Sequence, residues 1–159
     1  MNNFLLSLST LLVFVTITSC CPCERARTPS VASYPGTKIS FETGGGFSGY
    51  VSGTAITADG LVLTWNGRPG MRENLDTLAR MDAAQHAQLL ADLYALEPAG
   101  IRHQESGNMT TSLTVTSGDE SWYWSWPGVR DDIEAVPEKL RPLRDLVVTA
   151  LDAIRPAQE

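Results

Sequence analysis

All three cysteines of this 159-residue chain lie between residues 20 and 23, and none follows them. A fold that depends on disulfide bonds distributes its cysteines through the domain. The rest of this chain therefore has to fold by burying an apolar core, without covalent cross-links. Hydrophobic residues make up 43% of the sequence and charged residues 19%, which is the balance of a globular protein, and the length suits one domain.

A short apolar run precedes the cysteines at residues 4–17, FLLSLSTLLVFVTI. A helix that crosses the hydrocarbon core of a bilayer needs about 20 apolar residues, so this run is too short to span. Its length is that of the apolar core of a signal peptide. The run ends at Ile17-Thr18-Ser19-Cys20, which resembles the lipobox of bacterial lipoproteins: an aliphatic residue, two small residues and a cysteine.

This resemblance implies that residues 1–19 are a cleaved lipoprotein signal peptide and that Cys20 is the site of lipid attachment. In that family the sulfur carries a diacylglycerol and the new amino group is usually acylated too, and several chains anchor a protein more firmly than one. Residue 21 is not Asp, so the family's sorting tendency implies the outer membrane, on its periplasmic or surface face. The chain lacks the usual Lys or Arg before the apolar run, which leaves an ordinary signal peptide or an uncleaved anchor as alternatives.

After the lipid site, residues 20–37 contain three prolines and no periodicity, so we predict a flexible linker. A single α+β domain is expected over residues 38–155. Residues 38–43 alternate between polar and apolar, as a half-buried strand does. The glycine-rich segment 44–49 matches the dinucleotide-binding pattern G-x-G-x-x-G, but a strand-like segment follows it where that motif requires a helix. We therefore predict a turn there.

Two hairpins are predicted from their loop residues. Asp59-Gly60 as a two-residue loop pairs Thr54 with Trp65, which makes Trp65 a core residue. Gly118-Asp119 pairs Leu113 with Trp124 and Val115 with Trp122 in the same way. Trp126 then opposes Thr111 near the end of its strand, where it is expected to be exposed and is a candidate contact residue.

Two helices are predicted. Asp82 suits the N-cap of a helix that ends near residue 95, and the spacing of apolar residues from Leu140 to Ile154 predicts a second helix with Pro142 in its first turn. The expected order is β-ββ-α-ββ-α, which gives an antiparallel sheet of about five strands with both helices on one face.

Catalytic, metal and cofactor sites are not predicted. Net charge is −6 and the basic residues are scattered, which argues against nucleic-acid binding. His103 and Glu105 lack a third metal ligand, Cys21 and Cys23 fall short of the four ligands of structural zinc, and His86 is expected to be solvated. A Ser–His–Asp arrangement stays open, because it is defined by geometry and not by sequence order. We expect a protein that is not an enzyme.

Residues 39–49, ISFETGGGFSG, resemble the first strand and Gly-Gly-Phe-Ala-Gly-like turn of the emfourin-type family, with Ser48 in place of the usual alanine. That family consists of protein inhibitors of thermolysin-like metallopeptidases. A leucine-rich and alanine-rich helix and the segment 137–151 support the likeness, which covers roughly residues 38–155. The resemblance implies a partner among secreted or periplasmic metallopeptidases.

Such an inhibitor needs an exposed loop with an apolar side chain that fills a pocket beside the catalytic zinc. The predicted loop at residues 66–74 offers Met71, flanked by Arg68 and Arg72; alternatively, Met71 packs beneath its own loop. The sequence thus predicts a membrane-tethered lipoprotein with a small binding domain. The alternative function is a structural or interaction lipoprotein of the cell envelope, without inhibitory or catalytic activity.

Overall fold

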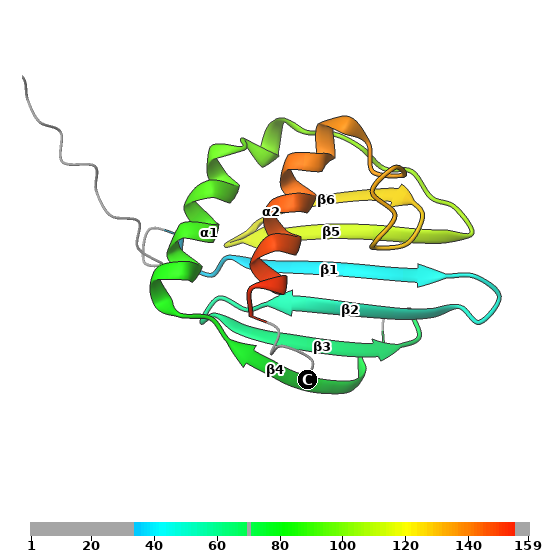
Figure 1. Ribbon diagram of the computed structural model, residues 1–159, viewed down its shortest axis with the longest axis horizontal. Helices are drawn as coiled ribbons and strands as arrows, with labels where there is room; N and C mark the ends of the chain where they lie inside the picture. The colour runs from blue at the N-terminus through cyan, green and yellow to red at the C-terminus, as the bar shows by residue number, and fades with distance from the viewer. Residues whose placement is uncertain (1–33, 70, 155–159) are drawn as a thin grey trace, which may run out of the picture.

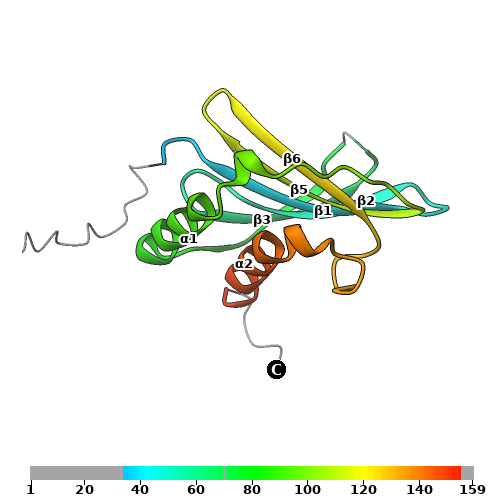
Figure 2. The same cartoon turned by 90° about the horizontal axis from the view of Figure 1, so that it is seen from above.

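The computed structural model describes residues 34–69 and 71–154, and the predicted signal peptide, Cys20 and most of the predicted linker lie outside the described residues. The described chain forms one antiparallel sheet of six strands in the order β4-β3-β2-β1-β5-β6. Both helices lie on the same face of this sheet, and the other face carries no helix (Figures 1 and 2). The predicted α+β class and the one-sided arrangement of helices are confirmed.

The elements follow one another along the chain with short connections. Their bounds are β1 (Lys38–Gly45), β2 (Tyr50–Ile56), β3 (Leu61–Gly67), β4 (Glu73–Arg80), α1 (Ala83–Ala95), the 3₁₀ turn η2 (Pro98–Gly100), β5 (Met109–Ser117), β6 (Glu120–Pro127), the 3₁₀ turn η3 (Glu138–Leu140) and α2 (Arg141–Asp152).

The glycine-rich segment forms the turn between β1 and β2, as predicted. Gly45, Gly46 and Gly49 have φ angles of 115°, 67° and 63°. These values lie in the left-handed region, which residues with a Cβ rarely adopt. The glycines thus make this hairpin possible, and Phe47 at its tip is fully exposed.

The hairpin of β2 and β3 has a register one residue away from the predicted one. The N–H of Thr57 bonds to the carbonyl of Leu61, so the loop has three residues and ends at Gly60, whose φ is 79°. Thr54 therefore pairs with Thr64, and Gly53 pairs with Trp65. Because side chains alternate along a strand, this shift moves Trp65 to the face without helices. Trp65 is buried, as predicted, but it lies outside the core cluster beneath the helices.

The strand β4 was not predicted, because apolar and polar residues do not alternate in its sequence. Seven of its eight residues are exposed, and only Ala79 is partly buried. β4 is an edge strand, and its pairing with β3 is interrupted by two irregularities. Bulges and charged residues are common at sheet edges, where they discourage pairing with other chains.

The hairpin of β5 and β6 has the predicted register. Leu113 pairs with Trp124, and Thr111 pairs with Trp126. The predicted exposure of Trp126 is wrong, however, because none of its surface is accessible. It packs against Phe41, with 6.1 Å between the ring centroids, and so belongs to the core.

The helix-side face of the sheet changes from apolar to polar along the strands. Its first row across the sheet is apolar throughout and comprises Trp122, Val115, Ile39, Ile56 and Val62. The third row keeps only one apolar residue and comprises Trp126, Thr111, Thr43, Ser52 and Asn66. The apolar rows and the helices together form the core.

The helices begin as the sequence predicts. The Asp82 carboxylate accepts hydrogen bonds from the N–H groups of Ala84 and Gln85, so it caps α1. Pro142 lies in the first turn of α2, where a missing N–H costs no helical hydrogen bond. None of the helices in the described residues combines the length and apolar character needed to cross a membrane.

The packed domain begins earlier than predicted. Tyr34 stacks on Tyr94 of α1 with 4.8 Å between ring centroids. Thr37 is buried, and its hydroxyl lies 3.1 Å from both the Tyr94 hydroxyl and the Ser117 hydroxyl. Residues 34–37, predicted to be the end of the linker, are therefore part of the fold because they bury an aromatic ring and a hydroxyl against it.

Candidate functional site

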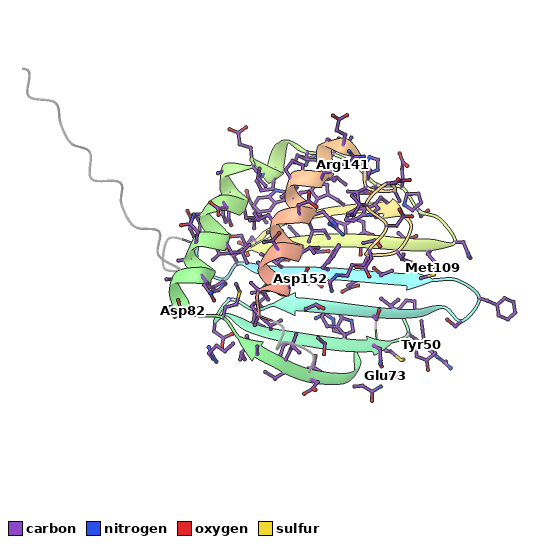
Figure 3. The ribbon with its side chains drawn as sticks, in the orientation of Figure 1. Tyr50, Glu73, Asp82, Met109, Arg141 and Asp152 are labelled. Carbon is purple, nitrogen blue, oxygen red and sulfur yellow. The ribbon has the colours of Figure 1, made fainter. Side chains whose placement is uncertain are left out.

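Exposed apolar side chains gather at the end of the sheet that lies away from the N-terminus of β1. β1 begins near Tyr34 and runs the length of the sheet to the β1–β2 turn, where Phe47 and Tyr50 are exposed. Tyr50, Glu73 and Met109 mark this end in Figure 3, whereas Asp82 marks the other end. We call the end with Phe47, Tyr50 and Met71 the distal end.

The predicted contact loop lies at the distal end, on the face without helices. Arg68, Met71 and Arg72 line a hollow of about 440 Å³ together with Trp65, Val51, Glu42 and Pro69. Three of the four residues predicted to contact a partner are thus brought together. The fourth, Trp126, is buried on the opposite face and does not take part.

Met71 lines this hollow and has 62% of its surface exposed. The sequence left two alternatives for Met71, an exposed position and a position packed beneath its own loop. The structure places it in the exposed position. An exposed methionine on a loop is an apolar group that a partner can bury.

Described residues on either side of residue 70 tie the loop that carries Met71 to the sheet. The Met71 N–H donates to the Arg68 carbonyl at 2.8 Å, which closes a turn. At the base of the loop, the Asn74 amide donates to the Asn66 side-chain oxygen at 2.7 Å. Gly67 lets the two sides of the loop approach closely, because a Cβ there would lie 2.2 Å from the Met71 carbonyl oxygen.

Trp65 forms the floor beneath this loop, although only 5% of its surface is exposed. Its ring lies over Gly53 of β2, where a Cβ would come within 2.3 Å of the indole. The guanidinium of Arg72 covers the ring at 4.3 Å from the centroid and pairs with Glu42 of β1 at 3.2 Å. The indole is therefore enclosed between the sheet and an arginine.

Sequence reasoning missed two features of this end of the molecule. Trp65 was missed as the floor of the loop because the register of its hairpin was wrong. Phe47 was not singled out as a contact residue, although a single aromatic residue within a glycine-rich turn has few neighbours to bury it. That pattern is the signal by which Phe47 could have been found.

The two histidines have different surroundings. His86 is 3% exposed, so the prediction that it is solvated is wrong. Burial lowers the pKa of His86, against a weaker opposing attraction from Asp59. His103 Nε2 lies 3.7 Å from a Glu105 carboxylate oxygen. Within residues 34–69 and 71–154, no three His, Cys, Asp or Glu side chains are grouped to bind a metal ion.

The sequence was compared with protein-family models and with curated proteins. No family model and no curated protein matches this chain.

Proposed function

We propose that this chain is an exported, lipid-anchored binding protein that inhibits a thermolysin-like metallopeptidase through its distal end. The observation that carries the proposal is the exposure of Met71 beside Arg72, which packs on Trp65 and pairs with Glu42. The resemblance of the strand and turn at residues 39–49 to the emfourin-type family indicates the class of peptidase. The lipobox-like residues 17–20 supply the membrane anchor.

A fixed loop favours inhibition because binding then costs little conformational entropy. An inhibitor whose loop becomes ordered only on binding loses part of its affinity to that ordering. Here the Arg72–Trp65 contact, the Asn74–Asn66 hydrogen bond and the turn closed by the Met71 N–H restrain the loop in the free protein. These contacts hold Arg72 and the base of the loop before a partner binds, which lowers the entropic cost of burying Met71.

The proposed anchor and the proposed contact surface lie at opposite ends of the sheet. The first described residue, Tyr34, packs on α1 and lies at the end of the sheet opposite the β1–β2 turn (Figure 1). A strand rises about 3.3 Å per residue, so the eight residues of β1 separate the two ends by roughly 25 Å. A tether at residue 20 would thus join the domain at the end farthest from the Met71 loop.

Charge adds a second element to the contact surface. Arg68 and Arg72 flank Met71 in a chain whose net charge is −6. Arginine at the rim of an interface favours partners with acidic groups around their pocket, and it acts mainly on the rate of association. We therefore expect inhibition to be faster at low ionic strength.

The experiment measures peptide hydrolysis by thermolysin in the presence of the full chain, purified in detergent. We expect inhibition, and we expect Met71→Asp to weaken it by well over tenfold, because a carboxylate cannot be buried in an apolar pocket. The matched control is Leu75→Asp, which changes a side chain that is 57% exposed on β4. Unchanged hydrolysis at micromolar concentrations of the unmodified chain would end the proposal.

The same assay locates the contact on the distal end. Phe47→Asp changes the fully exposed tip of the β1–β2 turn, which is also at the distal end but is separate from the loop with Met71. A loss of inhibition with Phe47→Asp alone would move the contact from the Met71 loop to that turn. If the unmodified chain inhibits no thermolysin-like enzyme, the exposed Phe47 and Tyr50 favour the alternative, an interaction lipoprotein of the cell envelope.

A further inference from the structure

Met71 differs from the other described methionines in its exposure to solvent. The sequence contains four methionines, of which Met1 lies in the predicted signal peptide. Met71 has 62% of its surface exposed, whereas Met81 is 7% exposed and belongs to the core cluster. Met109 is half-buried at the start of β5. Within residues 34–69 and 71–154, Met71 is therefore the methionine most open to solutes.

The two other described methionines are shielded by the elements around them. Met81 lies between β4 and α1, and its N–H donates to the Gly60 carbonyl at 2.9 Å. Met109 lies at the distal end, where Figure 3 labels it, and it pairs with Gly45 of β1. Its sulfur faces the β1–β2 turn, because a Cβ at Gly46 would lie 3.1 Å from it. These neighbours limit the approach of a solute to both side chains.

Access to the sulfur matters because a hydroperoxide oxidises methionine by direct contact. The sulfur lone pair attacks one peroxide oxygen, and an S–O bond forms as the O–O bond breaks. The sulfur loses two electrons, the peroxide gains them, and the departing oxygen takes up a proton and leaves as water when the oxidant is hydrogen peroxide. The product is methionine sulfoxide. Water assists this proton transfer, so a sulfur in an apolar core reacts slowly.

Oxidation changes what Met71 offers to a partner. The thioether is flexible and apolar, whereas the sulfoxide is polar and accepts hydrogen bonds. A polar group that is buried without a hydrogen-bond partner costs free energy. Met71 lies outside the core cluster. Its oxidation therefore alters the contact surface and leaves the core as it is.

We propose that Met71 is a modification site, at which hydroperoxides form the sulfoxide before Met81 and Met109 react. The consequence for a partner rests on the proposed function: the sulfoxide weakens binding to a peptidase. Methionine sulfoxide reductases reverse the oxidation. The Met71 loop is then a contact that peroxide turns off and a reductase turns on again.

The reactivity of each methionine can be measured separately, because trypsin divides them among three peptides. Residues 39–72, 81–102 and 103–130 each contain one methionine and end in arginine. The full chain, in a peroxide-free detergent, is treated with hydrogen peroxide, and mass spectrometry follows the gain of one oxygen in each peptide. We expect Met71 to react at least about tenfold faster than Met81, with Met109 between them.

Denaturation supplies the control for these rates. In urea that unfolds the chain, the three rates should converge, because the methionines no longer differ in exposure. Equal rates in the folded chain, or faster oxidation of Met81 or Met109 than of Met71, would overturn the proposal. This measurement does not depend on any peptidase.

Inhibition of thermolysin, assayed after catalase has removed the peroxide, measures the effect on the contact. We expect the oxidised chain to inhibit at least about tenfold more weakly than the untreated chain, and a sulfoxide reductase to restore inhibition. Met71→Leu keeps an apolar side chain of similar volume without the sulfur, so it should inhibit equally before and after peroxide treatment. The matched control, Met109→Leu, should remain sensitive to peroxide.

The variants also separate the possible failures. Met71→Leu retains Cys21 and Cys23, so a loss of inhibition in the treated variant would trace the effect to groups other than Met71 and refute its role as the switch. If the untreated chain does not inhibit thermolysin, the proposed function fails. The peptide rates alone then decide whether Met71 is the modification site.

Discussion

The Arg72 guanidinium covers the Trp65 ring at 4.3 Å from its centroid and bridges to Glu42 at 3.2 Å. This contact links β3, the loop after it and β1 on the face without helices. It also covers the Trp65 indole, which is therefore as buried as a core residue although no helix packs on this face of the sheet. A contact between a cation and an aromatic ring therefore ties Arg72, the residue after Met71, to the sheet.

Replacing Arg72 by alanine tests this contact. A cation over an aromatic ring contributes about 0.5–1 kcal/mol at exposed sites and more where it is desolvated, and an exposed ion pair adds at most about 1 kcal/mol. We expect Arg72→Ala to lower the free energy of unfolding by about 1 kcal/mol, measured by urea denaturation. The control is Arg68→Ala in the same loop, with an expected change within about 0.5 kcal/mol. Equal effects of the two substitutions would show that Trp65 gains nothing from Arg72.

A substitution at Gly53 gives a second test of how Trp65 packs on the sheet. A Cβ at position 53 would lie 2.3 Å from the indole, whereas a Cβ at Gly100 would meet no atom within 4 Å. Neither glycine has a positive φ, so Gly100→Ala is a matched control. We expect Gly53→Ala to lower the free energy of unfolding by roughly 1–3 kcal/mol, because the ring has to move.

A double-mutant cycle shows whether that cost comes from Trp65. In a Trp65→Leu background, the smaller side chain leaves room for the new methyl group. We expect Gly53→Ala to cost much less there, with a coupling energy of at least about 0.5 kcal/mol between the two positions. Additive effects would mean that Gly53 is required for a reason other than the indole.

The buried His86 predicts how stability depends on pH. Desolvation lowers the pKa of His86 in the folded state below its ordinary value of 6.5, and the Asp59 carboxylate opposes this only in part. The unfolded state then binds more protons below pH 6.5, so the free energy of unfolding falls as the pH drops through that value and levels off below the folded-state pKa. Urea denaturation between pH 8 and pH 5 measures the fall.

Variants of the two histidines assign this pH dependence. We expect His86→Leu to remove most of the change, and we expect His103→Gln to keep it. The pKa of Asp59 is lowered as well, chiefly by a hydrogen bond from Thr57, but its contribution is lost only below about pH 3.8 and does not overlap. A pH dependence that survives in His86→Leu would contradict the assignment.

The parts of the fold that the sequence predicts are those where only one pattern is consistent with the residues. On β5, Leu113 and Val115 alternate with small polar residues, so a single register buries both, and Leu113 then pairs with Trp124. On β3, by contrast, Val62 is apolar and so are Leu61 and Leu63 on either side. The alternation of apolar and polar residues is then consistent with two registers of β2 and β3. The length of the loop before β3 determines which of the two forms.

The candidate sites are predicted less well, because they depend on relations between strands. The loop with Met71 is recognisable from its residues alone, but its floor depends on the register that pairs Trp65 with Gly53. A hollow of about 490 Å³ on the helix-side face depends on the row that aligns Thr43, Ser52 and Asn66 and on a segment far along the chain. Each of these residues alone is typical of a solvated strand. β4 was missed for a similar reason: an edge strand that is exposed on both faces does not require alternating apolar and polar residues.

The most direct test of the anchor concerns Cys20, which lies outside the described residues. The lipobox-like sequence predicts that the native protein begins at Cys20 and carries a diacylglycerol on its sulfur. Mass spectrometry of the protein from cells should find that mature N-terminus, and an inhibitor of lipoprotein processing should shift the mass to the uncleaved, lipidated precursor. Cys20→Ser should prevent lipidation and abolish partitioning into detergent. A native protein that retains Met1 and an unmodified thiol would exclude lipid anchoring, but it would not bear on the Met71 loop, because that loop belongs to the folded domain.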